Sequence, residues 1–153
     1  MPVNLNFMNK YLLLFIFCVA SFTQLHAQQW LTNFQQAKEL STTQEKTILL
    51  VFQGSDWCAP CIKLNREIFE TEHFLTYAKD HFIMLQADFP RRKKNALSPE
   101  LQAHNNALAE RYNKGGVFPF VVVLNKDGRV LGQTSYSKKT PQEYIVELEG
   151  FIK

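Results

Sequence analysis

Cysteines, long hydrophobic runs and net charge are all scarce in this sequence. Three cysteines occur in 153 residues, and the formal net charge is only +3. The longest unbroken apolar run, residues 11–20, is well short of the ~20 residues that a helix needs to span a bilayer. Repeats and low-complexity stretches are absent, and the length suits one domain with its own core. These absences argue against a repeat protein and against a membrane-spanning helix.

Charge is almost missing from the N-terminal segment. Lys10 is the only charged residue before Lys38, and the apolar run after Lys10 leads into a polar stretch closed by Ala27. A basic start, a short apolar core and a small residue before the cut are typical of a secretory signal peptide. We therefore expect residues 1–27 to be removed on export and residues 28–153 to form the mature domain. An uncleaved N-terminal anchor is the alternative.

Removal of the signal peptide would also remove Cys18 and leave Cys58 and Cys61 as the two cysteines. The bulky residues before Cys18 do not resemble a lipoprotein cleavage box, so we expect no lipid anchor. An exported protein works where disulfides persist. A disulfide between Cys58 and Cys61 would close a short loop and remove little entropy from the unfolded chain. A structural disulfide is the alternative, but the spacing favours a chemical role.

The apolar patterns predict an α/β domain. Continuous branched runs indicate buried strands, and apolar residues at helical spacing indicate amphipathic helices. The alternation of the two, followed by a hairpin, predicts a mixed central sheet with helices on both faces. The predicted helices are residues 30–40, a helix from Cys58, a helix from Thr71, residues 99–112 and a helix from Thr140; the predicted strands are 47–52, 82–88, 117–124 and 129–134.

Four basic residues lie together in a predicted loop over residues 89–99, at Arg91, Arg92, Lys93 and Lys94. Such a run could meet an acidic partner or nucleic acid, but it is more often a solvated loop. We therefore expect no nucleic-acid partner.

The residues Trp57-Cys58-Ala59-Pro60-Cys61 follow a buried strand and a Gly-Ser-Asp turn, at the expected start of a helix. A helix N-terminus favours the thiolate form of Cys58, and the thiolate is what attacks a disulfide. Cys61 lies about one helical turn later, so it can attack the mixed disulfide formed at Cys58. Pro60 fixes the backbone between them, and Trp57 offers an apolar surface to a peptide.

These residues resemble the thioredoxin superfamily over most of residues 30–153. The resemblance also rests on Gly116-Val117-Phe118-Pro119, which precedes the apolar run Val121–Leu124. It implies a thioredoxin-like fold, with Pro119 as the cis-proline beside the redox pair and Phe118 as a residue that docks substrate backbone. It further implies a protein-disulfide oxidoreductase that uses no cofactor, exchanges with protein thiols or disulfides, and depends on a separate redox partner protein.

The sequence departs from the thioredoxin pattern at three places. Phe52 stands where thioredoxins usually have a buried carboxylate, and Phe120 stands where a threonine usually follows the cis-proline. Residues 89–99 look like an insertion, and Asp56 is expected in an exposed turn. The spacing of His73 and His81 from the cysteine pair does not match a zinc finger, and His104 adds no motif, so we expect no metal.

Two functions remain open. One is a disulfide-exchange enzyme, and the other is a chaperone-like module that binds peptides in a groove around Trp57, Phe118 and Phe120. Because Ala59 and Pro60 include no histidine, the enzyme is expected on the reducing or isomerising side. We expect a monomer in a bacterial periplasm, with a secretory-pathway lumen or the extracellular space as the alternative.

Overall fold

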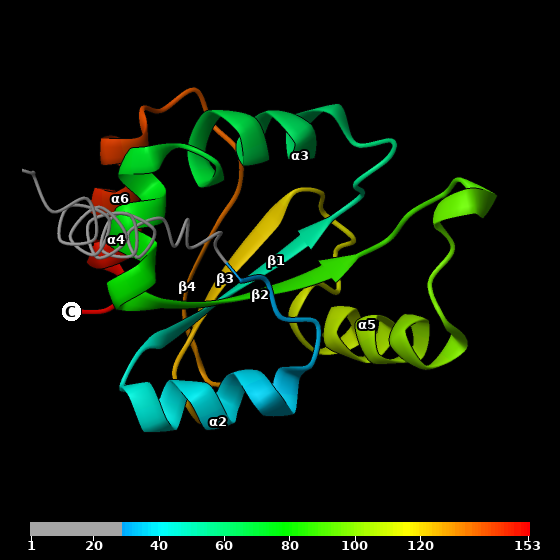
Figure 1. Cartoon of the computed structure of the whole chain (residues 1–153), viewed down its shortest axis with the longest axis horizontal. Helices are drawn as coiled ribbons and strands as arrows, with labels where there is room; N and C mark the ends of the chain where they lie inside the picture. The colour runs from blue at the N-terminus through cyan, green and yellow to red at the C-terminus, as the bar shows by residue number, and fades with distance from the viewer. Residues whose placement is uncertain (1–28) are drawn as a thin grey trace, which may run out of the picture.

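The structure, a computed structural model, describes residues 29–153, and the expected signal peptide with Cys18 and Ala27 lies outside that range. Figure 1 shows the arrangement of the elements. They are α2 (Phe34–Gln44), β1 (Thr47–Gln53), α3 (Ala59–Leu64), the π-helical turn η1 (Asn65–Phe69), α4 (Glu72–His81), β2 (Phe82–Asp88), the 3-10 turn η2 (Lys93–Asn95), α5 (Pro99–Tyr112), β3 (Phe120–Leu124), β4 (Val130–Thr134) and α6 (Pro141–Gly150).

The four strands form one mixed sheet in the order β2-β1-β3-β4. β1 runs parallel to β2 and antiparallel to β3, and β3 and β4 form an antiparallel hairpin. The helices α3, α4 and α6 cover one face, and α2 and α5 cover the other (Figure 1). The predicted mixed sheet with helices on both faces is confirmed.

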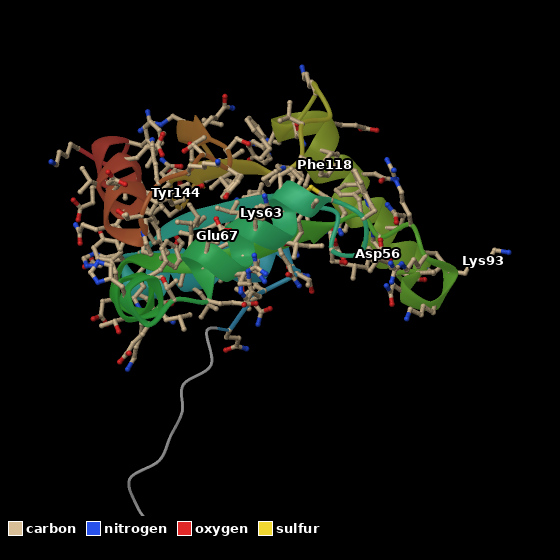
Figure 2. All side chains as sticks on the ribbon, turned by 90° about the horizontal axis from the view of Figure 1, so that it is seen from above. Asp56, Lys63, Glu67, Lys93, Phe118 and Tyr144 are labelled. Carbon is tan, nitrogen blue, oxygen red and sulfur yellow. A yellow bond between two sulfur atoms is a disulfide. The ribbon has the colours of Figure 1, made fainter. Side chains whose placement is uncertain are left out.

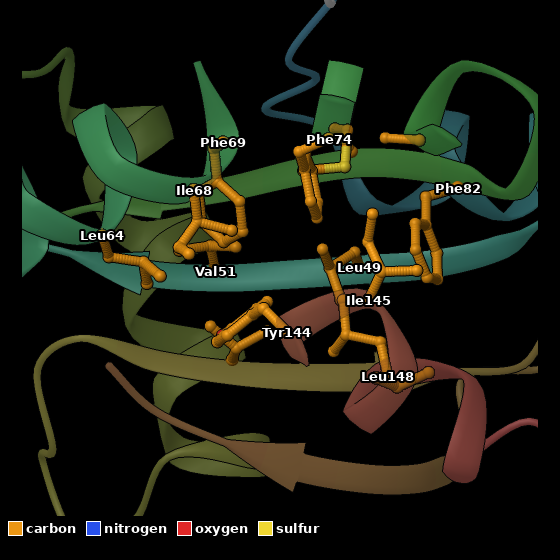
Figure 3. Packing of buried hydrophobic residues seen from close by; sticks show 14 residues of the cluster. Leu49, Val51, Leu64, Ile68, Phe69, Phe74, Phe82, Tyr144, Ile145 and Leu148 are labelled. Carbon is orange, nitrogen blue, oxygen red and sulfur yellow. The ribbon is translucent and has the colours of Figure 1, made fainter. Parts of the chain in front are cut away.

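The central strand β1 is buried on both faces because its side chains alternate between two cores. Leu49 and Val51 pack with α3, η1, α4 and α6, whereas Ile48, Leu50 and Phe52 pack with α2 and α5. Figure 3 shows the first of these cores. The strand's unbroken apolar sequence follows from this burial on both faces.

Two expected elements begin later than predicted, and the first of them, α2, also ends later, at Gln44. The helix predicted over residues 30–40 begins only at Phe34, because Asn33 caps it by accepting a 2.9 Å hydrogen bond from Gln36 N–H. Leu31 instead forms an isolated parallel bridge with Leu85 at the edge of β2. The strand predicted from residue 117 begins only at Phe120, after a proline that cannot donate to the ladder.

The other helix starts follow their capping residues. Ser98 accepts a hydrogen bond from the N–H of Leu101 at the start of α5, and Thr71 accepts one from Phe74 N–H at the start of α4. Thr140 forms a capping box with Glu143 at the start of α6. A side-chain oxygen at this position satisfies an N–H that the helix itself leaves unpaired, which is why these three predictions are confirmed.

The π-helical turn η1 was not predicted. It continues α3 with one extra residue in the turn, and two consecutive apolar residues, Ile68 and Phe69, are both buried there. The Phe69 ring lies 5.6 Å from Trp30, 5.0 Å from Phe74 and 6.0 Å from Tyr144, centroid to centroid. Phe69 therefore joins η1 to α4, α6 and the N-terminal segment. Across residues 29–153, no helix combines the length and apolar character that a membrane crossing needs.

Candidate active site

The two cysteines lie at the start of α3. Cys58 is the N-cap residue, and its Sγ accepts a 3.3 Å hydrogen bond from the backbone N–H of Cys61. Pro60 occupies the first turn, where its missing N–H costs nothing. Cys58 and Cys61 form a disulfide with their Cα atoms 5.2 Å apart, and each residue is only 4% exposed. The structure thus describes the oxidised pair at a helix N-terminus.

The turn before the cysteines is held at both ends. The carbonyl of Gly54 accepts hydrogen bonds from the N–H groups of Trp57 (3.3 Å) and Cys58 (2.9 Å). Asp88, the last residue of β2, accepts from the N–H (2.8 Å) and hydroxyl (2.6 Å) of Ser55. Two adjacent parallel strands therefore fix the position of Cys58.

Trp57 is immobilised beside the pair. Its indole N–H donates a 2.7 Å hydrogen bond to the carbonyl of Phe89, and its ring meets Phe118 edge-on at 5.6 Å. A cleft of about 380 Å³ opens between Trp57, Phe118 and the Phe89–Arg91 segment. A Cβ added to Gly54 would lie 2.3 Å from the indole. The Trp57 ring can therefore pack in this position only because residue 54 has no side chain.

Pro119 follows a cis peptide bond from Phe118, as the resemblance predicts. The carbonyl of Pro119 accepts a 2.6 Å hydrogen bond from the hydroxyl of Ser135. The side chain of Asn113 holds Val117, the residue before Phe118: it accepts a hydrogen bond from Val117 N–H at 3.0 Å and donates one to the Val117 carbonyl at 2.9 Å. Val117 itself is 46% exposed, so an apolar side chain stands open just before the Phe118–Pro119 bond.

The insertion over residues 89–99 is attached to the active-site turn, which sequence reasoning missed. The Asp56 carboxylate accepts from the N–H groups of Arg91 (2.9 Å) and Arg92 (3.0 Å) and from the side-chain amide of Asn95 (2.8 Å). These hydrogen bonds, the Arg91 N–H first, hold the pKa of Asp56 below its ordinary value. The Arg91 guanidinium stacks over the Trp57 ring at 3.6 Å from its centroid.

Phe52 is fully buried, as its position on β1 predicts, with its ring centroid 6.4 Å from that of Phe120. Apart from tyrosine, the polar side chains buried in the described part of the chain are Ser41, Asn105 and Asn113. None of these is a carboxylic acid, so Phe52 has no buried acidic substitute there.

The histidines have structural contacts of their own. His104 Nε2 accepts a 3.1 Å hydrogen bond from the N–H of Phe34. His81 stacks on Tyr77 at 4.0 Å, and His73 contacts the side chain of Gln142 at 2.7 Å. Within residues 29–153, no three histidine, cysteine or acidic side chains gather as metal ligands would.

The disulfide lies at a helix start after β1, and the cis-proline precedes β3, the strand paired with β1; this arrangement in a mixed α/β sheet is that of a thiol–disulfide oxidoreductase. The model of a thioredoxin-like family matches residues 29–126, and the chain belongs to that family. It is a protein-disulfide oxidoreductase with Cys58 and Cys61 as its cysteine pair.

Two curated relatives come from Chlamydia pneumoniae. The chain is 31% identical to disulfide bond reductase DsbH over 125 residues, which cover 82% of this chain and 73% of DsbH. It is 25% identical to thioredoxin-related protein DsbJ over 131 residues, covering 81% of this chain but only 37% of DsbJ. The chain therefore spans little more than a third of the length of DsbJ.

Solved structures agree on the fold. A DsbH oxidoreductase superposes with a TM-score of 0.75 at 28% identity, covering 88% of this chain and 96% of that one. A thioredoxin from Thermus thermophilus superposes with a TM-score of 0.59 at 17% identity, covering 81% of this chain and 86% of the other. The second likeness shows the thioredoxin fold alone.

Proposed function

We propose that this protein reduces or isomerises disulfides in other exported proteins, with Cys58 as the attacking residue and Cys61 as the resolving one. The observation that carries the proposal is the hydrogen bond from Cys61 N–H to Cys58 Sγ at the N-cap of α3. In the reduced protein, the same N–H and the positive end of the helix favour the Cys58 thiolate. Cys61 lies one turn inside the helix, within reach of the sulfur of Cys58.

The exchange balances in two steps. The Cys58 thiolate attacks a substrate disulfide, forms a mixed disulfide and releases one substrate thiolate. Cys61, losing its proton, then attacks Cys58 Sγ, which forms the Cys58–Cys61 disulfide and releases the second substrate thiol. Two electrons pass from the protein to the substrate. A separate redox partner protein must return the pair to the dithiol.

The reducing direction is supported by the residues between the cysteines. Ala59 and Pro60 provide neither a charge nor a side-chain donor to stabilise the thiolate further. A less stabilised thiolate makes the disulfide harder to reduce and lowers its reduction potential. The name of the relative DsbH, a disulfide bond reductase, points in the same direction.

Export is supported by the composition of the N-terminus, where the apolar run after Lys10 ends at Ala27 in a signal-peptide pattern. We place the mature domain, residues 28–153, in the periplasm as a monomer whose substrates are protein thiols and disulfides. Intact mass of the exported protein tests the cut after Ala27, and light scattering tests the monomer.

The direction is tested by equilibrating the pure protein with glutathione and measuring the fraction of disulfide. We expect a reduction potential nearer to about −270 mV than to about −120 mV, and a potential above about −150 mV would assign the protein to the oxidants. Turnover of insulin disulfides, with Cys58→Ser as the control, tests the enzyme itself. Peptide binding without any turnover would instead support the chaperone-like module.

A further inference from the structure

The segment of residues 89–95, here called the basic wall, borders the cleft beside Trp57 and carries four cations, of which Arg91 lines the cleft. It starts at the end of β2, closes one side of the cleft beside Trp57, and holds Arg91, Arg92, Lys93 and Lys94. Figure 2 shows Lys93 at the projecting tip beyond Asp56, on the side of the molecule away from Tyr144. The run of cations therefore begins at the cleft, where Arg91 lies against Trp57, the residue before Cys58.

The basic wall is a built structure. The carboxylate of Asp56 accepts three hydrogen bonds from the wall, and the indole of Trp57 donates one to the carbonyl of Phe89. Arg91 is fixed further by its stack on the Trp57 ring. The Arg91 guanidinium therefore lies against the side chain of the residue directly before Cys58, the proposed attacking cysteine.

The four cations are exposed and lack ion-pair partners among residues 29–153. The nearby carboxylates Asp56, Asp88 and Glu100 form no side-chain ion pair with these cations. Asp56 accepts from the backbone of the wall, Asp88 accepts from Ser55, and Glu100 accepts from its own N–H and from Ser98. The wall therefore carries four cations against one contacting carboxylate, Asp56, and offers net positive charge to a partner that approaches the cleft.

We infer that the basic wall selects protein substrates that carry acidic residues near their reactive cysteine. This inference rests on the proposed disulfide exchange and names the substrate class of that same site. A bound peptide extends by about 3.3 Å per residue, so acidic side chains a few positions from the cysteine would reach the wall. Exposed cations act over a Debye length of about 10 Å and raise encounter rates with anionic partners.

A polypeptide fits the wall better than nucleic acid does. Single-stranded nucleic acid binds by stacking its bases on open aromatic rings. Here Arg91 already covers Trp57, and Phe118 meets the same indole edge-on. Disulfide exchange at the neighbouring Cys58–Cys61 pair also requires a sulfur, which nucleic acid lacks.

The test uses two peptides that each contain one internal disulfide and differ only in flanking Asp and Glu residues, replaced by Asn and Gln in the second. The reduced full-length mature chain is mixed with each in a single turnover, so that no redox partner is needed. We expect the acidic peptide to react about tenfold faster or more at low salt, and the two rates to converge at high salt.

Three variants make the test specific. The variant R92Q/K93Q/K94Q should lose the preference, and R92E/K93E/K94E should favour a matched basic peptide instead. The control K126Q/R129Q/K153Q removes three cations from the β3–β4 turn and the C-terminus, which lies at the opposite end of the molecule from η2 (Figure 1), and should keep the preference.

Equal rates for the two peptides at low salt, or a preference that survives R92Q/K93Q/K94Q, would overturn the selection of acidic substrates while leaving disulfide exchange in place. Failure of both peptides to react would remove the proposed exchange itself. Two competitors are then added to the reaction of the acidic peptide: a short oligonucleotide, and the acidic peptide with its cysteines replaced by serine. Stronger inhibition by the oligonucleotide would assign the wall to nucleic acid.

Discussion

The carboxylate of Asp56 accepts a 2.9 Å hydrogen bond from the backbone N–H of Arg91, 35 positions later in the chain. The turn that precedes the cysteine pair and the insertion after β2 are therefore one unit. Whatever loosens this contact should also free the Arg91 guanidinium from the Trp57 ring.

Asp56→Asn should open the insertion to protease. Asparagine lacks the negative charge that draws three donors to this side chain, so the bonds to Arg91, Arg92 and Asn95 weaken. We expect trypsin to cut after residues 91–94 several-fold faster than in the parent, as measured by mass spectrometry. Asp127→Asn, in the turn between β3 and β4, is the matched control and should leave that rate unchanged.

The same contact should depend on pH. The pKa of Asp56 is held below its ordinary value of 3.8 in the folded protein. Its contribution is therefore fully present above about pH 4 and is lost as the pH falls through the lowered folded pKa. Trp57 fluorescence in a Trp30→Phe background should change over that acid range, and addition of Asp56→Asn should abolish the change. An identical acid transition with Asn at position 56 would contradict the assignment.

Gly54→Ala should displace Trp57. The added Cβ would lie 2.3 Å from the indole, which must move and lose its hydrogen bond to Phe89. Since one such bond contributes about 0.5–1.5 kcal/mol, we expect the rate with peptide disulfides to fall about 2- to 10-fold. Gly115→Ala is the control, because its Cβ meets only Val117 at an ordinary 3.7 Å.

The expected roles of the cysteines can be separated by alkylation. At about pH 6, the reduced protein should be labelled first at Cys58, since only that sulfur lies at the helix N-cap. Peptide mapping reads the order directly. Cys61→Ser should accumulate a mixed disulfide with substrate, whereas Cys58→Ser should not. Faster labelling of Cys61 would reverse the two roles.

The π-helical turn should prove important for stability. Phe69→Ala removes a 3% exposed ring that contacts Trp30, Phe74 and Tyr144, so unfolding should become easier by about 3–5 kcal/mol. Ile62→Ala, on the preceding helix but 48% exposed, should change the free energy of unfolding by less than about 1 kcal/mol. Urea titrations of the oxidised proteins give both values.

Local signals in the sequence predicted most of this fold. Ser98 before Pro99 marked the start of α5, and the unbroken apolar run of β1 marked the central strand, because capping and burial leave traces in neighbouring residues. The helix expected from Trp30 was wrong because Leu31 pairs with Leu85, a residue 54 positions away.

The site divides in the same way. The motif at residues 57–61 and the cis bond before Pro119 were expected from the sequence and its resemblance. The contacts of Asp56 and Trp57 with residues 89–95 were not, since they depend on how an insertion folds back over more than 30 positions. An aspartate in a turn gives no indication of which distant N–H groups it will hold.

The buried ring of Phe52 has a consequence for timing. Phe52 provides no carboxylate at its position on β1 that could take the thiol proton of Cys61. In the resolution step proposed for Cys61, we expect that proton to pass to water or to the sulfur that the substrate is releasing. Thiol–disulfide exchange is faster for a more acidic departing thiol. The rate at which a substrate protein is released therefore depends on the pKa of its own leaving cysteine.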